Sequence, residues 1–126
     1  MPNLLYVLLG GAIGAGARYE FGRLVIRQIG PGLPWGTLGV NLLGGLCMGM
    51  LAGGFAGREW VDRPLWLLLG VGVLGGFTTF SAFSLDLFLM LQRGEAGTAF
   101  AYALISAVGA LALLAVGWWL MRAVAA

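Results

Sequence analysis

The stretch GGFTTFSAFS, residues 75–84, interrupts an otherwise apolar part of the chain. Gly75 and Gly76 each lower helix stability by about 1 kcal/mol relative to alanine. Thr78 and Thr79 follow them, and their hydroxyl groups compete for backbone hydrogen bonds. Backbone that leaves a helix inside a bilayer is tolerated only where it is buried in protein or lines water. The stretch therefore predicts a broken helix of the kind that presents backbone groups to ions.

The composition around this stretch is that of a membrane protein. Of the 126 residues, 60% are hydrophobic and 10% are charged, whereas about 25% are charged in an ordinary soluble domain. A helix needs about 20 apolar residues to cross the hydrocarbon core. We expect an all-α membrane protein with one domain, residues 1–126, and four transmembrane helices, of which the third is broken near mid-membrane. The expected spans cover about residues 3–27, 35–57, 64–91 and 97–122.

Turn-forming residues separate these spans. The sequences QIGPGLP (28–34), GREWVDRP (57–64) and QRGEAG (92–97) are rich in glycine, proline and charged residues. The first apolar run resembles a signal peptide in length, but no positive segment precedes it and three more spans follow. We therefore expect it to be the first transmembrane helix.

The arginines bear on orientation, because Lys and Arg counts in short loops decide how a chain inserts. If the spans alternate in direction, the flanking arginines divide equally: Arg23, Arg27 and Arg93 on one side, and Arg58, Arg63 and Arg122 on the other. This balance favours dual topology, although equal counts also arise by chance. Copies of both orientations could form an antiparallel homodimer with its two-fold axis in the membrane plane.

The ionisable residues argue against several classes of protein. Cys47 is the only cysteine and there is no histidine, so neither an internal disulfide nor a transition-metal site is expected. Proton-coupled transporters generally need an ionisable residue inside a span. Asp86 lies past the break, and the other acids lie at the end of the first span or in loops. A proton-driven pump is disfavoured, and so is an enzyme, because no suitable base accompanies the hydroxyl groups.

Small residues recur on one face of the second span. Gly45, Gly49, Gly53 and Gly57 are spaced every four residues, and Asn41 lies one step earlier. Helices in lipid approach closely through such residues, so we expect a contact face here. The Asn41 amide should point toward protein or a cavity, because leaving it unsatisfied in lipid would cost about 2–7 kcal/mol. Similar glycine pairs occur in the first and third spans: Gly10 with Gly14, and Gly72 with Gly76.

Aromatic and hydroxyl side chains gather after the break. Phe80 and Phe83 share a helix face, with Ser81 on the neighbouring face. The edge of a phenyl ring is positive and can approach an anion. The fourth span adds a polar line with i, i+4 spacing: Thr98, Tyr102 and Ser106. With the Asn41 amide, these groups predict a narrow, donor-rich route for a small anion, the alternative being ordinary packing and hydroxyl groups bonded to their own backbone.

Three motifs together resemble the Fluc/CrcB family of bacterial fluoride channels. They are GGAIGAGARY at 10–19, GTLGVNLLGG at 36–45 and GGFTTFSAFS at 75–84. The resemblance implies a passive, fluoride-selective channel of the bacterial inner membrane, built as an antiparallel dual-topology homodimer with two pores. The competing interpretations are a small dual-topology proton-coupled antiporter and a non-conducting membrane scaffold subunit.

The resemblance also implies roles for individual residues. Arg18 matches an arginine near an aqueous vestibule. The backbone carbonyls of Gly75 and Thr78 from both subunits would bind a structural Na⁺. Phe80 and Phe83 look like the phenylalanines that line the fluoride path, and Asn41 looks like its amide donor. The implied pathway as a whole comprises Asn41, Thr79, Phe80, Ser81, Phe83, Tyr102 and Ser106.

The chain departs from the family pattern at a few positions. Ala110 and Leu114 stand where the polar track of relatives continues with hydroxyl groups, and Ala82 stands where threonine is common. The resemblance therefore does not define the track beyond Ser106.

Overall fold

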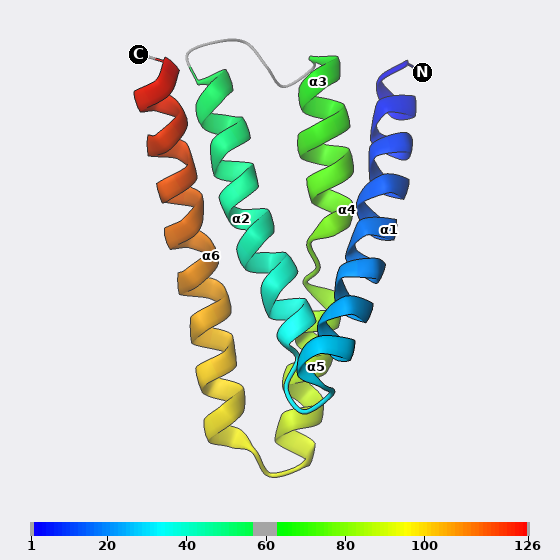
Figure 1. Cartoon of the computed structure of the whole chain (residues 1–126), viewed down its shortest axis with the longest axis vertical. Helices are drawn as coiled ribbons and strands as arrows, with labels where there is room; N and C mark the ends of the chain where they lie inside the picture. Colours follow the sequence, from blue (N-terminus) through cyan, green and yellow to red (C-terminus); the bar gives the residue numbers. More distant parts are fainter. Residues whose placement is uncertain (1, 57–62, 126) are drawn as a thin grey trace.

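The computed structural model describes residues 2–56 and 63–125, and its secondary structure is entirely helical (Figure 1). Helix α1 covers Pro2–Ile29, α2 covers Trp35–Phe55 and α6 covers Ala96–Ala125. Four shorter elements lie between α2 and α6: α3 (Pro64–Trp66), η1 (Leu67–Leu74), α4 (Gly75–Phe77) and α5 (Ser81–Gln92). The all-helical class is confirmed, and the third helix is broken inside the predicted stretch.

Glycine and proline set the helix boundaries. Gly30 has a φ of 101° and follows α1 directly, and Gly94 has a φ of 76° after α5. Such positive φ angles favour glycine, which is why these helices end there. Pro34 precedes α2, and Pro64 is the first residue of α3, a position that needs no backbone N–H donor. The turns predicted at 28–34 and 92–97 are thus present, while most of the predicted 57–64 turn lies outside the described residues.

Three stretches of the described chain are long and apolar enough to cross a membrane: 35–55, 64–92 and 96–124. Helix α1 is long enough as well, with 28 residues, but it does not reach the same hydropathy. Its first part, residues 2–17, carries no charge, whereas Arg18, Glu20, Arg23 and Arg27 follow in its last turns. The first of the four expected spans therefore stays a prediction.

Helices α2 and α6 pack closely along the predicted glycine face of α2. A Cβ atom on Gly45 would lie 2.8 Å from the carbonyl oxygen of Ala110, and one on Gly53 would lie 2.7 Å from that of Trp118. On Gly49 the corresponding distance, to a carbonyl oxygen of α6, would be 1.9 Å. The expected contact face is confirmed, except that Gly57 lies outside the described residues.

Helix α1 packs in the same way against η1 and α4. A Cβ atom on Gly10 would lie 2.2 Å from the carbonyl oxygen of Leu68, and one on Gly14 would lie 2.0 Å from that of Val73. Glycine on α1 thus lets two carbonyl groups approach its Cα atoms, as in Cα–H···O contacts. Of the glycines predicted in the first and third spans, Gly10 packs on Gly72, and Gly76 packs on Gly11.

The segment before the break is a π-helix, which the sequence analysis did not foresee. Within η1 the hydrogen-bonding interval lengthens, and the Gly75 N–H donates to the carbonyl of Gly70, five residues earlier. A π-helix is rare and is often found at functional sites. Gly70 and Gly72 are both buried here, so the wider turns pack through residues without side chains.

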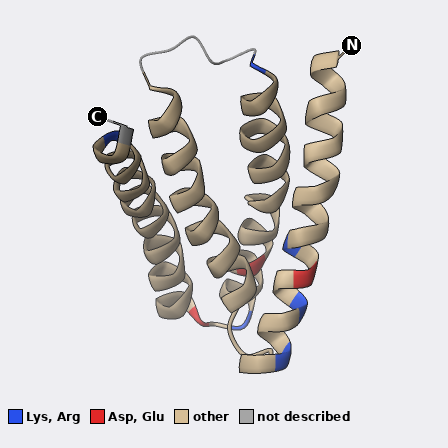
Figure 2. Ribbon diagram, turned by 45° about the horizontal axis from the view of Figure 1, so that its top comes forward, with Lys and Arg blue, Asp and Glu red and all other residues tan. Residues whose placement is uncertain are grey.

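The helix pairs diverge from one end of the molecule (Figure 1). The α1–α2 and α5–α6 turns lie at the narrow end, and both termini lie at the wide end. Charged residues gather toward the narrow end (Figure 2). The alternating helices place the flanking arginines as expected: Arg23, Arg27 and Arg93 at the narrow end, and Arg63 and Arg122 at the wide end. Arg58 lies outside the described residues.

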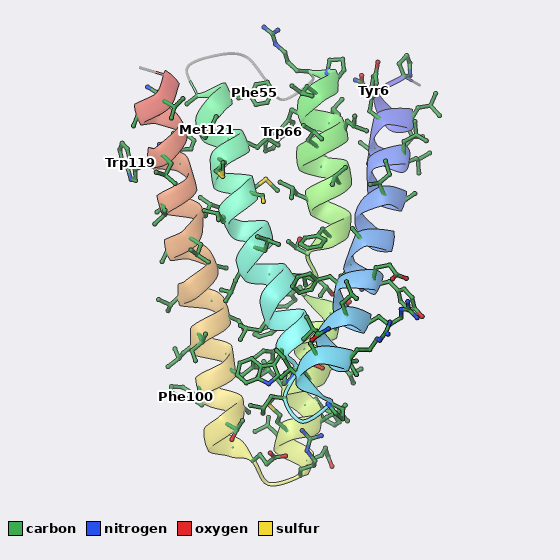
Figure 3. All side chains as sticks on the ribbon, viewed as in Figure 1. Tyr6, Phe55, Trp66, Phe100, Trp119 and Met121 are labelled. Carbon is green, nitrogen blue, oxygen red and sulfur yellow. The ribbon has the colours of Figure 1, made fainter. Side chains whose placement is uncertain are left out.

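The described part of a single copy has a small core. Met90, Ala99 and Tyr102 are buried together near the narrow end. At the wide end Phe55 and Trp66 meet edge to face, with ring centroids 6.3 Å apart. Phe100 and Trp119 point away from the bundle (Figure 3) and are both 68% exposed. Most of the apolar surface thus faces outward, as in a protein surrounded by lipid.

Candidate functional site

The break in the third helix begins at Thr78. Its backbone is extended, with φ −86° and ψ 160°, so the helical hydrogen-bond ladder stops there. The Thr78 N–H and Oγ1–H both donate to the carbonyl of Leu74, at 3.0 and 2.9 Å. These bonds fix the last turn before the break.

Asn41 on α2 holds the next residue of the break. Its Nδ2 donates to the carbonyl oxygen of Thr79 at 2.9 Å, and its Oδ1 accepts from the Thr79 N–H, also at 2.9 Å. The side-chain amide therefore pairs with the backbone as a neighbouring strand would. The prediction that this amide points toward protein is confirmed. One N–H of Nδ2 is left over from this pairing, because the amide group carries two.

Thr79 also starts the second half of the helix. Its Oγ1 accepts a hydrogen bond from the Ala82 N–H at 3.2 Å, which satisfies an amide group at the beginning of α5. The hydroxyl that the sequence analysis assigned to the pathway thus has a structural bond as well.

The carbonyl groups at the end of α4 have lost their helical donors. The Thr79 N–H, which would continue the helix by donating to Gly75, donates to Asn41 instead. The carbonyl of Gly76 accepts from Nε of Arg18 at 3.2 Å. Among the described residues no donor is found for the carbonyls of Gly75 and Thr78. Gly75 is exposed and Thr78 is half-buried. Free carbonyls at the end of a helix carry partial negative charge, so this end of the helix is suited to binding a cation.

The break opens into a groove of about 500 Å³. None of the residues that line it is charged. The groove brings together most of the predicted site: Asn41, Gly75, Thr78, Thr79, Phe80, Phe83 and Ser106. Ala110 and Leu114 form an apolar wall farther along α6. Ser81 and Tyr102 are not among the lining residues, and Ser81 is exposed.

The predicted phenylalanines lie in a row with Tyr102. The ring centroids of Phe80 and Phe83 are 5.8 Å apart, and those of Phe83 and Tyr102 are 5.1 Å apart. Phe80 is 78% exposed, so nothing in a single copy covers its outer face. The row connects the open groove to the buried core.

Ser106 is the one buried side chain in the described part of the chain whose polar atom lacks a hydrogen-bond partner. The residue is 5% exposed, and it lines the groove. A buried hydroxyl without a partner costs about 1–3 kcal/mol, so such a group calls for a water molecule or a ligand. The hydroxyl is therefore available to something that enters the groove.

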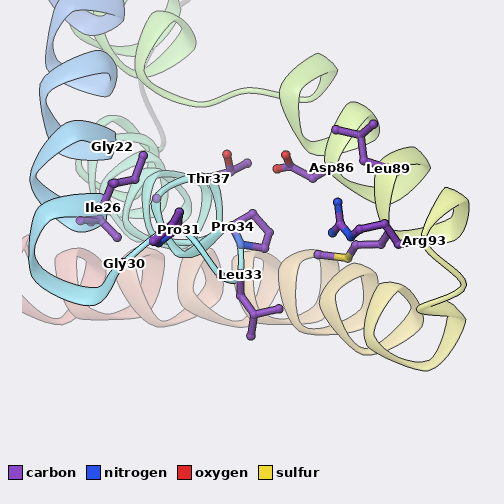
Figure 4. Close-up of a pocket in the computed structure, with 14 residues that line it drawn as sticks. Gly22, Ile26, Gly30, Pro31, Leu33, Pro34, Thr37, Asp86, Leu89 and Arg93 are labelled. Atoms are coloured by element: carbon purple, nitrogen blue, oxygen red, sulfur yellow. The ribbon is translucent and has the colours of Figure 1, made fainter.

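Tyr102 contacts a residue that the sequence analysis did not include in the site. Its hydroxyl donates to Oδ2 of Asp86 at 3.0 Å. Asp86 and Thr37 point toward one another across a cavity of about 350 Å³ beside the α1–α2 turn (Figure 4). A carboxylate within an apolar run is itself a signal of function, and this signal could have identified Asp86. Thr37 lies within the motif GTLGVNLLGG, but the sequence analysis assigned it no role.

A second cavity, of about 390 Å³, lies on the α1 side of the break. Arg18, Arg23 and Thr37 line it. Thr79 lines both this cavity and the groove, so the two spaces meet at the break. Arg18 thus lies in a hollow next to the groove and not in the groove itself, and its vestibule role stays a prediction.

Side chains of the described residues offer no metal site of the usual kind. No group of three or more His, Cys, Asp or Glu residues is found in residues 2–56 and 63–125. A metal ion at the break would have to bind backbone carbonyl oxygens, which suit hard cations.

The fold and the groove identify the class of protein: a multi-pass helical membrane protein whose interrupted helix borders an uncharged path. Residues 5–118 match the model of the family described as CrcB-like protein, Camphor Resistance (CrcB). The chain belongs to this family.

Similar curated proteins agree with this assignment. The chain is 54% identical to the fluoride-specific ion channel FluC of Phenylobacterium zucineum over 98% of both chains. It is 47% identical to the protein of the same name from Chelativorans sp., over 98% of this chain and 99% of that one. It is 48% identical to that of Caulobacter vibrioides, over 98% of both. The expectation of a transport protein rather than an enzyme is confirmed by these relatives.

Proposed function

We propose that this protein is a passive, fluoride-selective channel that exports fluoride across the bacterial inner membrane. Relatives that match this chain over nearly their whole length carry the name of a fluoride-specific ion channel. The observation that carries the proposal is the groove, which unites Asn41, Phe80, Phe83 and Ser106 without any charged side chain.

An uncharged groove suits rapid conduction of a small anion. Fluoride is strongly hydrated, so a pore must replace its water molecules with close contacts. A fixed positive charge would hold the ion too firmly, because conduction requires sites that the ion can leave. The remaining Asn41 N–H, the Ser106 hydroxyl and the positive edges of Phe80 and Phe83 provide attraction without such a charge.

The proposed channel is an antiparallel homodimer of four-span subunits, each a single domain over residues 1–126. In one copy the groove is open and Phe80 is 78% exposed, so a second copy is needed to enclose the path. The near-balance of arginines at the two ends permits insertion in both directions. An antiparallel pair then brings two equivalent grooves together. Ser81, exposed in one copy, would be covered by this contact.

A structural Na⁺ fits the break at the centre of this dimer. Gly75 and Thr78 line the groove, and their carbonyls lack donors among the described residues. In a two-fold dimer each copy would contribute both oxygen atoms to the ion. The bound ion would neutralise the partial negative charge at the end of α4 and link the subunits.

Fluoride efflux from liposomes tests the pore assignment. Purified protein is reconstituted, and fluoride release is followed with an electrode, with chloride as the control anion. Wild-type protein should release fluoride but not chloride. Replacing Phe80 or Phe83 by isoleucine, or Asn41 by aspartate, should abolish or strongly slow the flux while the dimer persists on size-exclusion chromatography.

Phe88→Ile is the matched control. Phe88 lies on the same helix and is 57% exposed, but it does not line the groove. Its substitution should leave the flux unchanged. If wild-type protein releases no fluoride, the channel assignment fails. If the Phe80 and Phe83 variants behave like Phe88→Ile, the pore assignment fails.

Topology needs its own measurement. A single cysteine placed after the C-terminal end of α6, in a Cys47→Ser background, should react with an impermeant thiol reagent from both sides of the membrane in roughly equal amounts. Labelling from one side only would show that all copies insert in the same direction, and the antiparallel dimer would be refuted.

A further inference from the structure

We infer that Arg18 is a positioning residue for ion passage, because it caps the carbonyl of Gly76 and keeps that carbonyl from facing the anion route. This inference rests on the proposed channel function. It assigns Arg18 a short-range role at the break, distinct from attraction of anions into the vestibule.

The contact joins two elements far apart in sequence. Nε of Arg18, on α1, donates to the carbonyl of Gly76, on α4, at 3.2 Å, and the bond is partly buried. The Phe80 N–H, which would occupy this carbonyl in a continuous helix, does not reach it because the backbone turns away at Thr78. Arg18 therefore replaces a lost backbone donor.

Among the described residues, Arg18 forms no ion pair with an acid. Within the described residues, Arg23 pairs with Glu20 at 3.5 Å. Arg93 pairs with Glu95. Glu20, two residues from Arg18 in the sequence, is thus engaged by Arg23.

The position of the Arg18 charge matters for an anion. The C-terminal end of a helix carries partial negative charge on its free carbonyls. Thr79 immediately follows this end and lines both the vestibule cavity and the groove. An anion that moves between the two spaces must therefore pass the carbonyl end of α4. Covering the Gly76 carbonyl with a cation removes one repulsive group from that passage.

The carbonyls of adjacent residues lie about 100° apart around a helix axis, so they face different neighbours. Arg18 occupies the Gly76 carbonyl on the α1 side. Gly75 lines the groove, where its carbonyl would bind the proposed Na⁺. The partial negative charge at the end of α4 would thus be neutralised on one side by the proposed Na⁺ and on the other side by Arg18.

A long-range electrostatic role makes a different prediction from a cap. Arg23 lines the same cavity as Arg18 and carries the same charge, but it pairs with Glu20, and no hydrogen bond from it to the described residues of the break is found. Attraction by exposed charge weakens with salt, since the Debye length falls from about 30 Å at 0.01 M to about 3 Å at 1 M. A hydrogen bond at contact distance is screened much less.

The experiment compares Arg18→Gln, Arg18→Met, Arg18→Lys and Arg23→Gln in liposomes at these two ionic strengths, set with an impermeant salt at constant sodium. Arg18→Gln and Arg18→Met should lower fluoride efflux about ten-fold at both, as expected for the loss of one charge-assisted hydrogen bond. Arg23→Gln should change efflux by less than about two-fold at 1 M, where its charge is screened. Arg18→Lys, which keeps a charged donor, should recover most of the flux.

Several outcomes would overturn the inference. One is that the neutral Arg18 variants match Arg23→Gln at high ionic strength. If those variants do not fold, Arg18→Lys decides: flux close to that of the wild type at both ionic strengths supports the cap. A loss that disappears at high ionic strength, or a large loss at both ionic strengths, contradicts it. Absence of flux in the wild-type protein would instead refute the proposed function.

Discussion

Replacing Asn41 by alanine should loosen the helix break by a predictable amount. The substitution removes both bonds to Thr79, each 2.9 Å long. A net value of about 1 kcal/mol for each bond gives about 2 kcal/mol in total. The value per bond lies above the average of about 0.6 kcal/mol measured for one hydrogen bond between membrane helices. Since 1.4 kcal/mol is a factor of ten, the population of the open break should rise about 30-fold.

Hydrogen–deuterium exchange in the peptide that contains residues 78–82 measures this change. In wild-type protein the Thr79 N–H is protected by Oδ1 of Asn41. Asn41→Ala should remove that protection, whereas Asn41→Asp keeps an acceptor oxygen and should retain it. Exchange around Gly45, which packs on α6, is the internal control. Equal exchange of residues 78–82 in Asn41→Ala and wild-type protein would refute the proposed role of Asn41 in holding Thr79. This conclusion would stand even if Asn41→Ala and Asn41→Asp both lost fluoride flux.

Three further substitutions test other parts of the structure. Gly49→Ala should lower the free energy of unfolding by about 1–3 kcal/mol, because its Cβ would lie 1.9 Å from a carbonyl of α6. The control Gly16→Ala, with nothing within 4 Å of its Cβ, should leave the thermal unfolding midpoint unchanged. Equal midpoints for the two variants would contradict the close packing of Gly49 on α6. Tyr102→Phe should destabilise by about 1–3 kcal/mol in the same assay, because Asp86 loses its donor, and an unchanged midpoint would argue against that bond. Ser106→Ala should leave stability equal or slightly higher, since the Oγ atom has no partner among the described residues, but it should slow fluoride efflux; unaltered efflux would remove Ser106 from the pathway.

The glycine pattern predicted the packing well because it encodes close backbone contact directly. Gly45, Gly49 and Gly53 meet α6 as their spacing indicates. The break was also predictable, since Gly75 and Gly76 precede two threonines at a point where lipid would not tolerate free backbone groups.

Other features depend on contacts between segments that are distant in sequence. Asn41 was expected to supply a pathway donor, but which backbone group its amide would meet was fixed only by how α2 lies against the break. The Tyr102–Asp86 bond likewise joins α5 and α6. The polar line of Thr98, Tyr102 and Ser106 is divided, because Ser106 faces the groove while Thr98 and Tyr102 line a separate small cavity.

The π-helical segment was missed for a different reason. Its apolar sequence, LLLGVGVL at 67–74, reads as an ordinary helix. The wider turns are accommodated by the neighbouring α1 glycines, where carbonyls of η1 approach Gly10 and Gly14. Local propensity contains no information about that neighbour.

The location of both chain ends at the same end of the bundle (Figure 1) constrains genetic fusion. Joining two copies head to tail with a short soluble linker would force them to insert in the same direction. A covalent pair with opposite orientations needs one additional hydrophobic crossing between the copies. A tandem gene with such an inserted helix would therefore fix the two copies in opposite orientations. A tandem gene without it would fix them in the same orientation.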